Sequence, residues 1–375
     1  MRIAINTHLL IYGKLDGIGW FTFETIKRLT HNHPEHEFIL IFDRKPAPEL
    51  RFPANTRIIV LPPPARHPIL WFIRFEMLMP LLLRRLKPDV YLSPDGWVSL
   101  HSPVPYIQVI HDLNFKHNPK DVPFWPRWYY NTFFPRYAHK AARIATVSHF
   151  SAADIAKSYG IPPEKIDVTH NGCNEAYRPN SLQEQEATRK EYSGEHPYFI
   201  YVGGIIPRKN VARMLQAFDR FKKDDTTQTR LIIVGPEKCS DNNVNRVLNS
   251  MQFRDEVIFM GRKNTRELNA LYSAATALVF VPYFEGFGIP ILEAFNAETA
   301  VITSNRTSMP EVAGDAALLV DPFSVEDIAT AMKKISTDKA LRESLIEKAR
   351  EQRKQFSWDN TAHKLWECIE KVVGK

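Results

Sequence analysis

The fold is decided by the stretch Tyr198-Phe-Ile-Tyr-Val-Gly-Gly-Ile-Ile-Pro-Arg-Lys-Asn210. Its first five residues are apolar or aromatic, which predicts a buried strand over Tyr198–Val202. Two glycines follow, and the apolar spacing that begins near Asn210 predicts a helix to about Phe221. A strand, a glycine turn and a helix in this order are typical of parallel sheets that carry helices on both faces.

The same unit recurs on both sides of this stretch, so we predict an α/β protein with two Rossmann-like, doubly wound parallel sheets. Before it, strands are predicted at Ile3–Asn6, Phe38–Phe42, Arg57–Leu61, Asp89–Ser93 and Ile107–His111. After it, they are predicted at Leu231–Val234, Val257–Met260, Leu278–Pro282 and Val301–Thr303.

The length of 375 residues exceeds one ordinary core and favours two domains. We place the first domain at residues 1–180 and the second at residues 190–355, and interpret the polar segment 178–197 as the linker. An amphipathic helix over Trp358–Val373, within residues 356–375, could pack on either domain, including back on the N-terminal one.

Composition narrows the class of protein. Hydrophobic residues make up 44% and charged residues 24%, as in globular proteins. The net charge of +7 suits nucleic acids, anionic membranes or phosphate-bearing small molecules, but no zinc-finger spacing or RNA-binding aromatic pattern occurs, so we expect no nucleic acid partner. The cysteines at 173, 239 and 368 are far apart and form no disulfide framework. No signal-peptide layout or membrane-spanning run is found, so we expect a cytoplasmic protein.

Two glutamates bracket a glycine-rich turn in Glu285-Gly-Phe-Gly-Ile-Pro-Ile-Leu-Glu293. Pro290 predicts the first turn of a helix, and we place Glu293 in that turn. A helix N-terminus offers free N–H groups and a positive dipole end, which suit a phosphate, and the carboxylates can accept hydrogen bonds from vicinal hydroxyls. The alternative is that Glu293 only complements the helix dipole and Glu285 is solvated.

The loop after Tyr198–Val202 combines glycines with cations. Gly203 and Gly204 let the backbone approach a ligand closely. Arg208 can fork onto phosphate oxygens and Lys209 adds a compact charge, so the two cations suit a departing diphosphate. The next residue, an asparagine, could cap the following helix. A solvated basic turn is the alternative.

Two further segments follow strands in the first half, at the strand ends where ligands of parallel sheets bind. Asp16-Gly-Ile-Gly19 is a shortened glycine loop that could approach a phosphate or an acceptor, or form a plain turn. His111 closes the strand Ile107–His111 and could donate a hydrogen bond to a hydroxyl or transfer a proton. A purely structural histidine is the alternative.

Together these segments resemble the retaining glycosyltransferases of family 4, which have the two-domain GT-B fold. The family's two glutamates are separated by seven residues, as Glu285 and Glu293 are. Val147–Ser151, His170–Gly172 and Ser304–Ala316 also look like family segments. The resemblance implies a first domain on the acceptor side, a second that binds a nucleotide sugar, and a donor site in the cleft between them.

The resemblance also implies roles for individual residues. Glu285 would contact donor sugar hydroxyls, and Glu293 would hold the ribose. Arg208 and Lys209 would bind the diphosphate, and His111 would meet the sugar near its reacting carbon. We regard His111, Arg208, Lys209 and Glu285 as catalytic. The remaining donor-binding positions would be Gly17, Gly19, Gly204, Arg262, Gly286, Phe287, Gly288, Ile289 and Glu293.

The segments Asp16–Phe21 and His111–Leu113 are similar to a subgroup that includes bacterial O-antigen mannosyltransferases, although that subgroup often has Arg-Tyr in place of Trp20-Phe21. The resemblance implies transfer of a hexose, with mannose from GDP-mannose as the first expectation, to a glycan or lipid-linked saccharide in bacterial surface polysaccharide biosynthesis. UDP-sugars and other GDP-sugars stay open as donors. Because no Asp-x-Asp pair is present, we expect no required metal ion.

Two rival functions remain open at this point. One is a GT-B sugar-nucleotide epimerase or phosphorylase, which the glutamate pair and the Arg-Lys-Asn segment disfavour. The other is an inactive sugar-nucleotide-binding subunit, which would be expected to have lost a key position, yet all of them are present.

Two stretches combine aromatic and basic residues. Trp71–Phe75 leads into Arg84–Lys87, and Phe124–Tyr130 is denser still. Such mixtures suit a membrane interface, which indicates peripheral contact with the anionic inner face of the plasma membrane. The alternative is that both stretches are helix cores.

Overall fold

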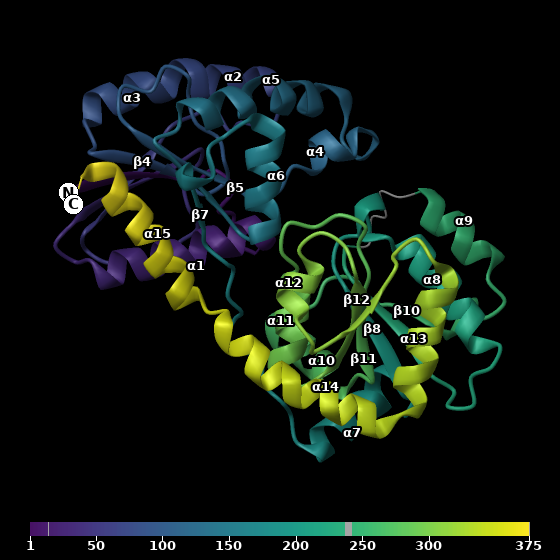
Figure 1. The fold of residues 1–375 in the computed structure, drawn as a ribbon. Helices are drawn as coiled ribbons and strands as arrows, with labels where there is room; N and C mark the ends of the chain where they lie inside the picture. Colours follow the sequence, from purple (N-terminus) through teal and green to yellow (C-terminus); the bar gives the residue numbers. More distant parts are fainter. Residues whose placement is uncertain (14, 237–241, 375) are drawn as a thin grey trace. The chain divides into compact units, whose positions relative to one another are not determined.

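The structure is a computed structural model that describes residues 1–13, 15–236 and 242–374, so Cys239 lies outside the described residues. The chain divides into two compact units, Met1–Gly172 together with Ser357–Lys375, and Cys173–Phe356. Each unit contains one parallel sheet covered by helices, which confirms the predicted fold class (Figure 1).

The first unit contains a seven-stranded sheet in the order β3-β2-β1-β4-β5-β6-β7. Its strands are β1 (Arg2–Asn6), β2 (Glu37–Phe42), β3 (Thr56–Val60), β4 (Val90–Ser93), β5 (Tyr106–Ile110), β6 (Arg143–Thr146) and β7 (Ile166–Val168). Five of these were predicted to within a residue or two. The short strands β6 and β7 were not predicted.

Helices cover both faces of the first sheet (Figure 1). They are α1 (Gly17–Asn32), α2 (Pro68–Phe72), the π-helical turn η1 (Ile73–Leu78), α3 (Met79–Leu86), α4 (Asn114–His117), α5 (Phe124–Lys140), α6 (His149–Tyr159) and α15 (Trp358–Val373). The C-terminal helix α15 packs against α1, with the ring centroids of Phe21 and Trp358 6.4 Å apart, and its Trp366 stacks on His33, the residue that follows α1, at 3.5 Å. The aromatic core on the opposite face is formed with η1, α3 and α5.

The second unit contains a six-stranded sheet in the order β10-β9-β8-β11-β12-β13. Its strands are β8 (Tyr198–Val202), β9 (Arg230–Val234), β10 (Val257–Phe259), β11 (Ala277–Phe280), β12 (Ala300–Ser304) and β13 (Leu318–Val320). Its helices are α7 (Leu182–Ser193), α8 (Val211–Lys222), α9 (Asn242–Ser250), α10 (Thr265–Ala274), α11 (Ile289–Asn296), α12 (Met309–Ala313), α13 (Val325–Thr337) and α14 (Lys339–Gln352).

The prediction of a linker over 178–197 was wrong, because α7 occupies most of this segment and belongs to the second unit. Ser181 and Glu184 form a capping box at its start. Arg189 anchors the helix by donating to the carbonyl of Ala274 at 2.9 Å. Only small polar residues of α7 are buried, so the segment has no apolar stripe from which a helix could be predicted.

The strand order places two switch points in the fold. Connections leave the sheet in opposite directions from β1 and β4 in the first unit, and from β8 and β11 in the second. Ligands of such sheets bind outside the carboxyl ends of the strands at these points. Among the helices that the structure describes, none is long and apolar enough to cross a membrane.

Candidate active site

The loops that follow β8 and β11 bring three predicted site residues together in the second unit. Arg208 and Lys209 end a short helical turn after β8, and Glu285 lies in the loop after β11. The Arg208 guanidinium donates to Glu285 Oε2, and Lys209 Nζ donates to the same oxygen at 2.5 Å. A main-chain hydrogen bond from Tyr283 N–H to the carbonyl oxygen of Arg208, 3.1 Å long, joins the two loops.

The two cations keep the Glu285 carboxylate charged. Burial by itself would raise the pKa of Glu285, but the charges and hydrogen bonds of Arg208 and Lys209 lower it below its usual range. Lys209 Nζ also lies 4.8 Å from the centre of the Phe280 ring, a cation–π contact. The positive charges are therefore held in place before any anionic ligand arrives, and a diphosphate could take them over from the carboxylate.

The turn Gly286–Gly288 leads directly into α11, whose first residues Ile289 and Pro290 are half-buried. Gly288 has a φ of +106°, a conformation that favours glycine. No side chain of the described residues caps α11, so its first N–H groups have no side-chain acceptor there. Ser308 Oγ donates toward the carbonyl oxygens of Glu285 and Phe287, at 2.9 and 3.1 Å, which fixes the turn. The predicted backbone positions, including Ile289 at the first residue of α11, thus sit on a supported helix N-terminus.

Glu293 lies one turn further along α11 than predicted. The helix begins at Ile289 and its first turn contains no acidic residue, so placing Glu293 in that turn was wrong. Tyr272 Oη instead donates to Glu293 Oε2 at 2.8 Å. Burial raises the pKa of Glu293, and hydrogen bonds from Tyr272 and Tyr177 offset only part of that effect. A partly desolvated carboxylate of this kind is ready to accept further hydrogen bonds.

Asn210 does not cap α8 with its side chain, contrary to the prediction. It has a φ of +63°, and its amide Nδ2 donates to the carbonyls of Val281 and Pro322 at 3.0 and 2.7 Å. Asparagine adopts this left-handed conformation more readily than most residues do. Asn210 therefore ties the basic turn to the loop after β11, which supports the cation–carboxylate cluster.

The other predicted residues of this unit lie around the same sheet edge. Gly204 is in the loop directly after β8, and a Cβ added to it would meet no atom within 4 Å. Arg262 is exposed in the loop between β10 and α10. Neither contacts the Glu285 cluster through any hydrogen bond or ion pair recorded for the described residues.

In the first unit, the glycine segment forms the beginning of α1. Asp16 is the N-cap residue, and its carboxylate accepts from the Gly19 N–H at 2.9 Å. Gly17 is the first residue of the helix. The segment is therefore a capped helix start that follows β1, rather than a full dinucleotide-binding loop.

His111 directly follows β5, and its imidazole Nε2 lies 2.8 Å from the carbonyl oxygen of Pro94. Because a carbonyl can only accept, Nε2 carries the proton of this bond. Burial lowers the pKa of His111, which favours the neutral ring. In that neutral tautomer Nδ1 is an acceptor, so the ring can receive a hydrogen bond from a hydroxyl. This differs from the donor role that we predicted.

A buried network beside His111 was not predicted. The Asp95 carboxylate lies 2.7 Å from His8 Nδ1, and it accepts from Asn6 Nδ2 and Ser93 Oγ, each at 2.8 Å. Asp95 comes directly after Pro94, so these bonds fix the carbonyl that holds His111. Asn6 and His8 lie at the end of β1, and Ser93 and Asp95 at the end of β4, so the bond between Asn6 and Asp95 joins residues 89 positions apart that no local spacing in the sequence connects.

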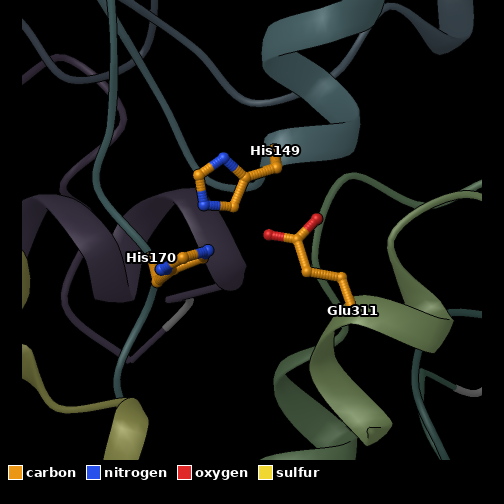
Figure 2. A group of neighbouring side chains, drawn as sticks. All are labelled: His149, His170 and Glu311. Atoms are coloured by element: carbon orange, nitrogen blue, oxygen red, sulfur yellow. The ribbon is translucent and has the colours of Figure 1, made fainter.

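The three family-like segments Val147–Ser151, His170–Gly172 and Ser304–Ala316 begin at or just after the carboxyl ends of β6, β7 and β12. Figure 2 labels His149, which begins α6 after β6, His170, which follows β7, and Glu311 of α12. The rings of His149 and His170 have centroids 5.3 Å apart. The histidines belong to the first unit and Glu311 to the second.

Comparison with known proteins agrees with this architecture. Residues 15–177 match the model of "Glycosyltransferase Family 4", and residues 183–352 match that of "Glycosyl transferases group 1". O-antigen chain mannosyltransferase B of Escherichia coli is 29% identical, and the alignment covers 96% of this chain and 97% of that protein.

Solved structures show the same fold at lower identity. Sucrose-phosphate synthase of Thermosynechococcus elongatus is 16% identical, with a TM-score of 0.79 over 100% of this chain and 99% of that one. HepE of Anabaena in complex with UDP-glucose is 14% identical, with a TM-score of 0.78 over 99% of each chain.

The fold and the two family matches, which together span most of the chain, define a glycosyltransferase with the GT-B fold. The first half of the chain carries the domain of glycosyltransferase family 4, and the second half carries that of the group 1 glycosyl transferases.

Proposed function

We propose that the protein transfers a hexose, with mannose from GDP-mannose as the first choice, to a glycan or lipid-linked saccharide in bacterial surface polysaccharide biosynthesis. We further propose retention of the anomeric configuration and no required metal ion. The observation that carries the proposal is the cluster of Arg208, Lys209 and Glu285 beside the start of α11. The similarity to an O-antigen mannosyltransferase over nearly the whole chain supports the choice of sugar and pathway.

The chemistry follows from where charge develops. When the bond between the anomeric carbon and the diphosphate breaks, negative charge builds on the departing oxygens, and Arg208, Lys209 and the α11 N–H groups would stabilise it. The acceptor oxygen then bonds to the same face of the anomeric carbon, and its proton passes to the departing phosphate. In this scheme Arg208 and Lys209 move their hydrogen bonds from Glu285 to the diphosphate, and the Glu285 carboxylate then accepts hydrogen bonds from hydroxyls of the donor sugar.

The remaining predicted residues would position the donor. Glu293, with Tyr272 behind it, would accept from the ribose hydroxyls. His111 would accept from a sugar hydroxyl through Nδ1, because its Nε2 proton is engaged by Pro94. Neither residue is assigned the role of a covalent nucleophile.

A thermal-shift screen with the full chain tests the proposal. GDP, UDP, ADP and their common sugar conjugates are added singly in the presence of EDTA, since a ligand that binds the folded state raises its melting temperature. We expect GDP and GDP-mannose to raise it and UDP to leave it unchanged. Anomeric NMR signals of the product then decide between retention and inversion.

The other outcomes each point to a different conclusion. Selective stabilisation by UDP-sugars would replace the proposed donor within the same family. Conversion of the donor sugar without an acceptor would indicate an epimerase. Stabilisation only after a divalent ion is restored would contradict metal independence, and stabilisation without turnover on any acceptor would favour a binding subunit.

A further inference from the structure

The helical segment formed by α2, η1 and α3 packs one row of apolar side chains into the core, buries the two charged residues of its middle part, and exposes further apolar side chains on its outer side. Arg74 and Glu76 are the charged residues between Pro68 and Leu83, and both are buried. Met77 and Leu81 are 54% and 60% exposed. A surface helix of a globular domain also packs an apolar stripe on the core, but it carries polar and charged residues on its outer side.

Internal hydrogen bonds fix this orientation. Glu76 accepts from Tyr137 Oη at 2.7 Å and from Leu100 N at 3.1 Å. Arg74 donates to the carbonyl of Leu61. Rotating the segment to bury its outer residues would remove these partners from two buried charges, at a cost of several kcal/mol. The exposed apolar residues are therefore a stable feature of the surface.

A second helix extends the exposed surface. Phe124, Trp125 and Trp128 of α5 are exposed, and Trp125 is 60% exposed. The Phe133 ring bridges the two helices, because its centroid lies 6.1 Å from that of Phe72 and 6.3 Å from that of Trp128. Figure 1 shows α2, α3 and α5 in one layer over the sheet. We define the apolar face as Ile69, Phe72, Met77, Leu81, Phe124, Trp125 and Trp128.

Cations border the apolar face, and its helices expose no carboxylate. Arg84, Arg85 and Lys87 are exposed at the C-terminal end of α3. Arg127 lies with its guanidinium carbon 5.8 Å from the centre of the Phe124 ring. The helix α5 contains no acidic residue, and the one glutamate of the other segment is Glu76, which is buried. The charge around this face thus complements an anionic surface.

We propose that the apolar face docks on the surface of an anionic lipid bilayer. The aromatic rings would sit at the headgroup level, the aliphatic side chains would enter the acyl boundary, and the bordering cations would contact lipid phosphates. The chain would lie on the membrane rather than cross it. This goes beyond the proposed function and does not depend on which donor the enzyme uses.

Vesicle co-sedimentation of the full chain tests the proposal, with vesicles of phosphatidylcholine alone or with added phosphatidylglycerol. We expect binding to the anionic vesicles at low salt that weakens as salt is raised. The double variant Met77→Glu and Leu81→Glu should bind at least about tenfold more weakly, because it loses apolar burial and adds negative charge. Leu182→Glu is the matched control, since Leu182 is 76% exposed on α7 of the second unit and should leave binding within about twofold.

Folding and oligomeric state complete the experiment. Melting temperatures and nucleotide-induced thermal shifts should be the same in the parent and both variants, because all three replaced residues are exposed. Absence of binding by the parent protein at low salt would overturn the proposal. So would equal loss in the Leu182 variant. A dimer that the double variant converts to a monomer, with no vesicle binding, would assign the face to a second copy of the chain.

Discussion

Replacing Lys209 with methionine should separate catalysis from folding in this enzyme. The Lys209 side chain is 12% exposed, and methionine keeps most of its apolar stem but removes the ammonium group that contacts Glu285. Arg208 still donates to the same carboxylate oxygen, so the substitution leaves no buried carboxylate without a partner. The substitution therefore removes one of the two positive charges at Glu285 but changes the packing around residue 209 little.

The two effects differ in size. A hydrogen bond to a charged group contributes about 1.5–3 kcal/mol, and the remaining Arg208 bond should reduce the loss of folding free energy to about 1–2 kcal/mol. For a domain of this size that lowers the melting temperature by roughly 2–4 °C per kcal/mol. One donor aimed at developing charge contributes about 3–4 kcal/mol to the transition state, so turnover should fall about 10²- to 10³-fold.

Lys222→Met is the matched control. Lys222 Nζ lies 2.7 Å from Asp225 Oδ2 and 3.0 Å from the carbonyl of Thr229, in a buried ion pair of the same unit. Breaking such a pair costs about 3–5 kcal/mol. This variant should therefore lose more stability than Lys209→Met, yet keep the parent turnover at temperatures where it is folded.

Turnover is measured as release of nucleoside diphosphate from the donor that the thermal screen selects, and stability is measured by calorimetry. A Lys209→Met protein that folds and turns over like the parent would refute the assigned role. Equal losses of turnover in the Lys209 and Lys222 variants would also refute it, because the effect would then follow from stability alone.

Three further predictions, one of them with a control substitution, test other parts of the structure. Glu293→Gln should raise the melting temperature of the ligand-free protein at pH 7–8, because the pKa of the Glu293 carboxyl is higher in the folded than in the unfolded state. The gain in melting temperature should shrink as the pH is lowered through the folded pKa. A pH series of melting curves would show this. Gly288→Ala should cost about 1–3 kcal/mol by calorimetry, because its φ is +106°, whereas Gly204→Ala, where the added Cβ meets open space, should stay within about 0.5 kcal/mol. Asp95→Asn should destabilise the first unit by about 3 kcal/mol in calorimetry, because it breaks the buried contact with His8. It should also lower kcat, because the carbonyl that holds His111 is less well fixed, while the nucleotide dissociation constant of the second unit changes by less than about twofold. Unchanged stability would contradict the role of the contact between Asp95 and His8.

The sequence was informative where structure depends on local pattern. Central strands are buried on both faces and form continuous apolar runs in the sequence, so Tyr198–Val202 was predicted with the observed bounds, and the other predicted central strands agree to within a residue or two. The short strand Ile166–Val168 contains an aspartate and is half-buried, and it was missed. The helix Leu182–Ser193 was missed because it is anchored by polar contacts rather than by an apolar stripe.

In the candidate site, too, residues within one motif could be predicted and contacts between distant loops could not. Arg208, Lys209 and Glu285 were identified from two contiguous motifs, but their shared carboxylate oxygen could not be predicted, because it depends on a loop contact across more than 70 residues of sequence. The role of Asn210 also depends on partners far along the chain, 71 and 112 residues away. Local capping rules cannot anticipate such partners.

The two aromatic-basic stretches lie partly in the core, as Trp71, Phe75 and Tyr129 do, and partly on the apolar face, and composition alone could not predict this division. Hydropathy counts the residues of Pro68–Leu86 without stating which way each one points, and a helix of this composition could serve either purpose. The direction is set by the partners of Arg74 and Glu76, which lie between 13 and 61 residues away in the sequence. Those buried charges fix the rotation of the helix. Glu76→Leu should therefore let the helix rotate, bury part of the outer apolar side chains and reduce binding to anionic vesicles, although it changes no residue of the apolar face. Loss of vesicle binding in that folded variant would link the internal hydrogen bonds to the membrane contact, and unchanged binding would show that the outer face does not depend on them.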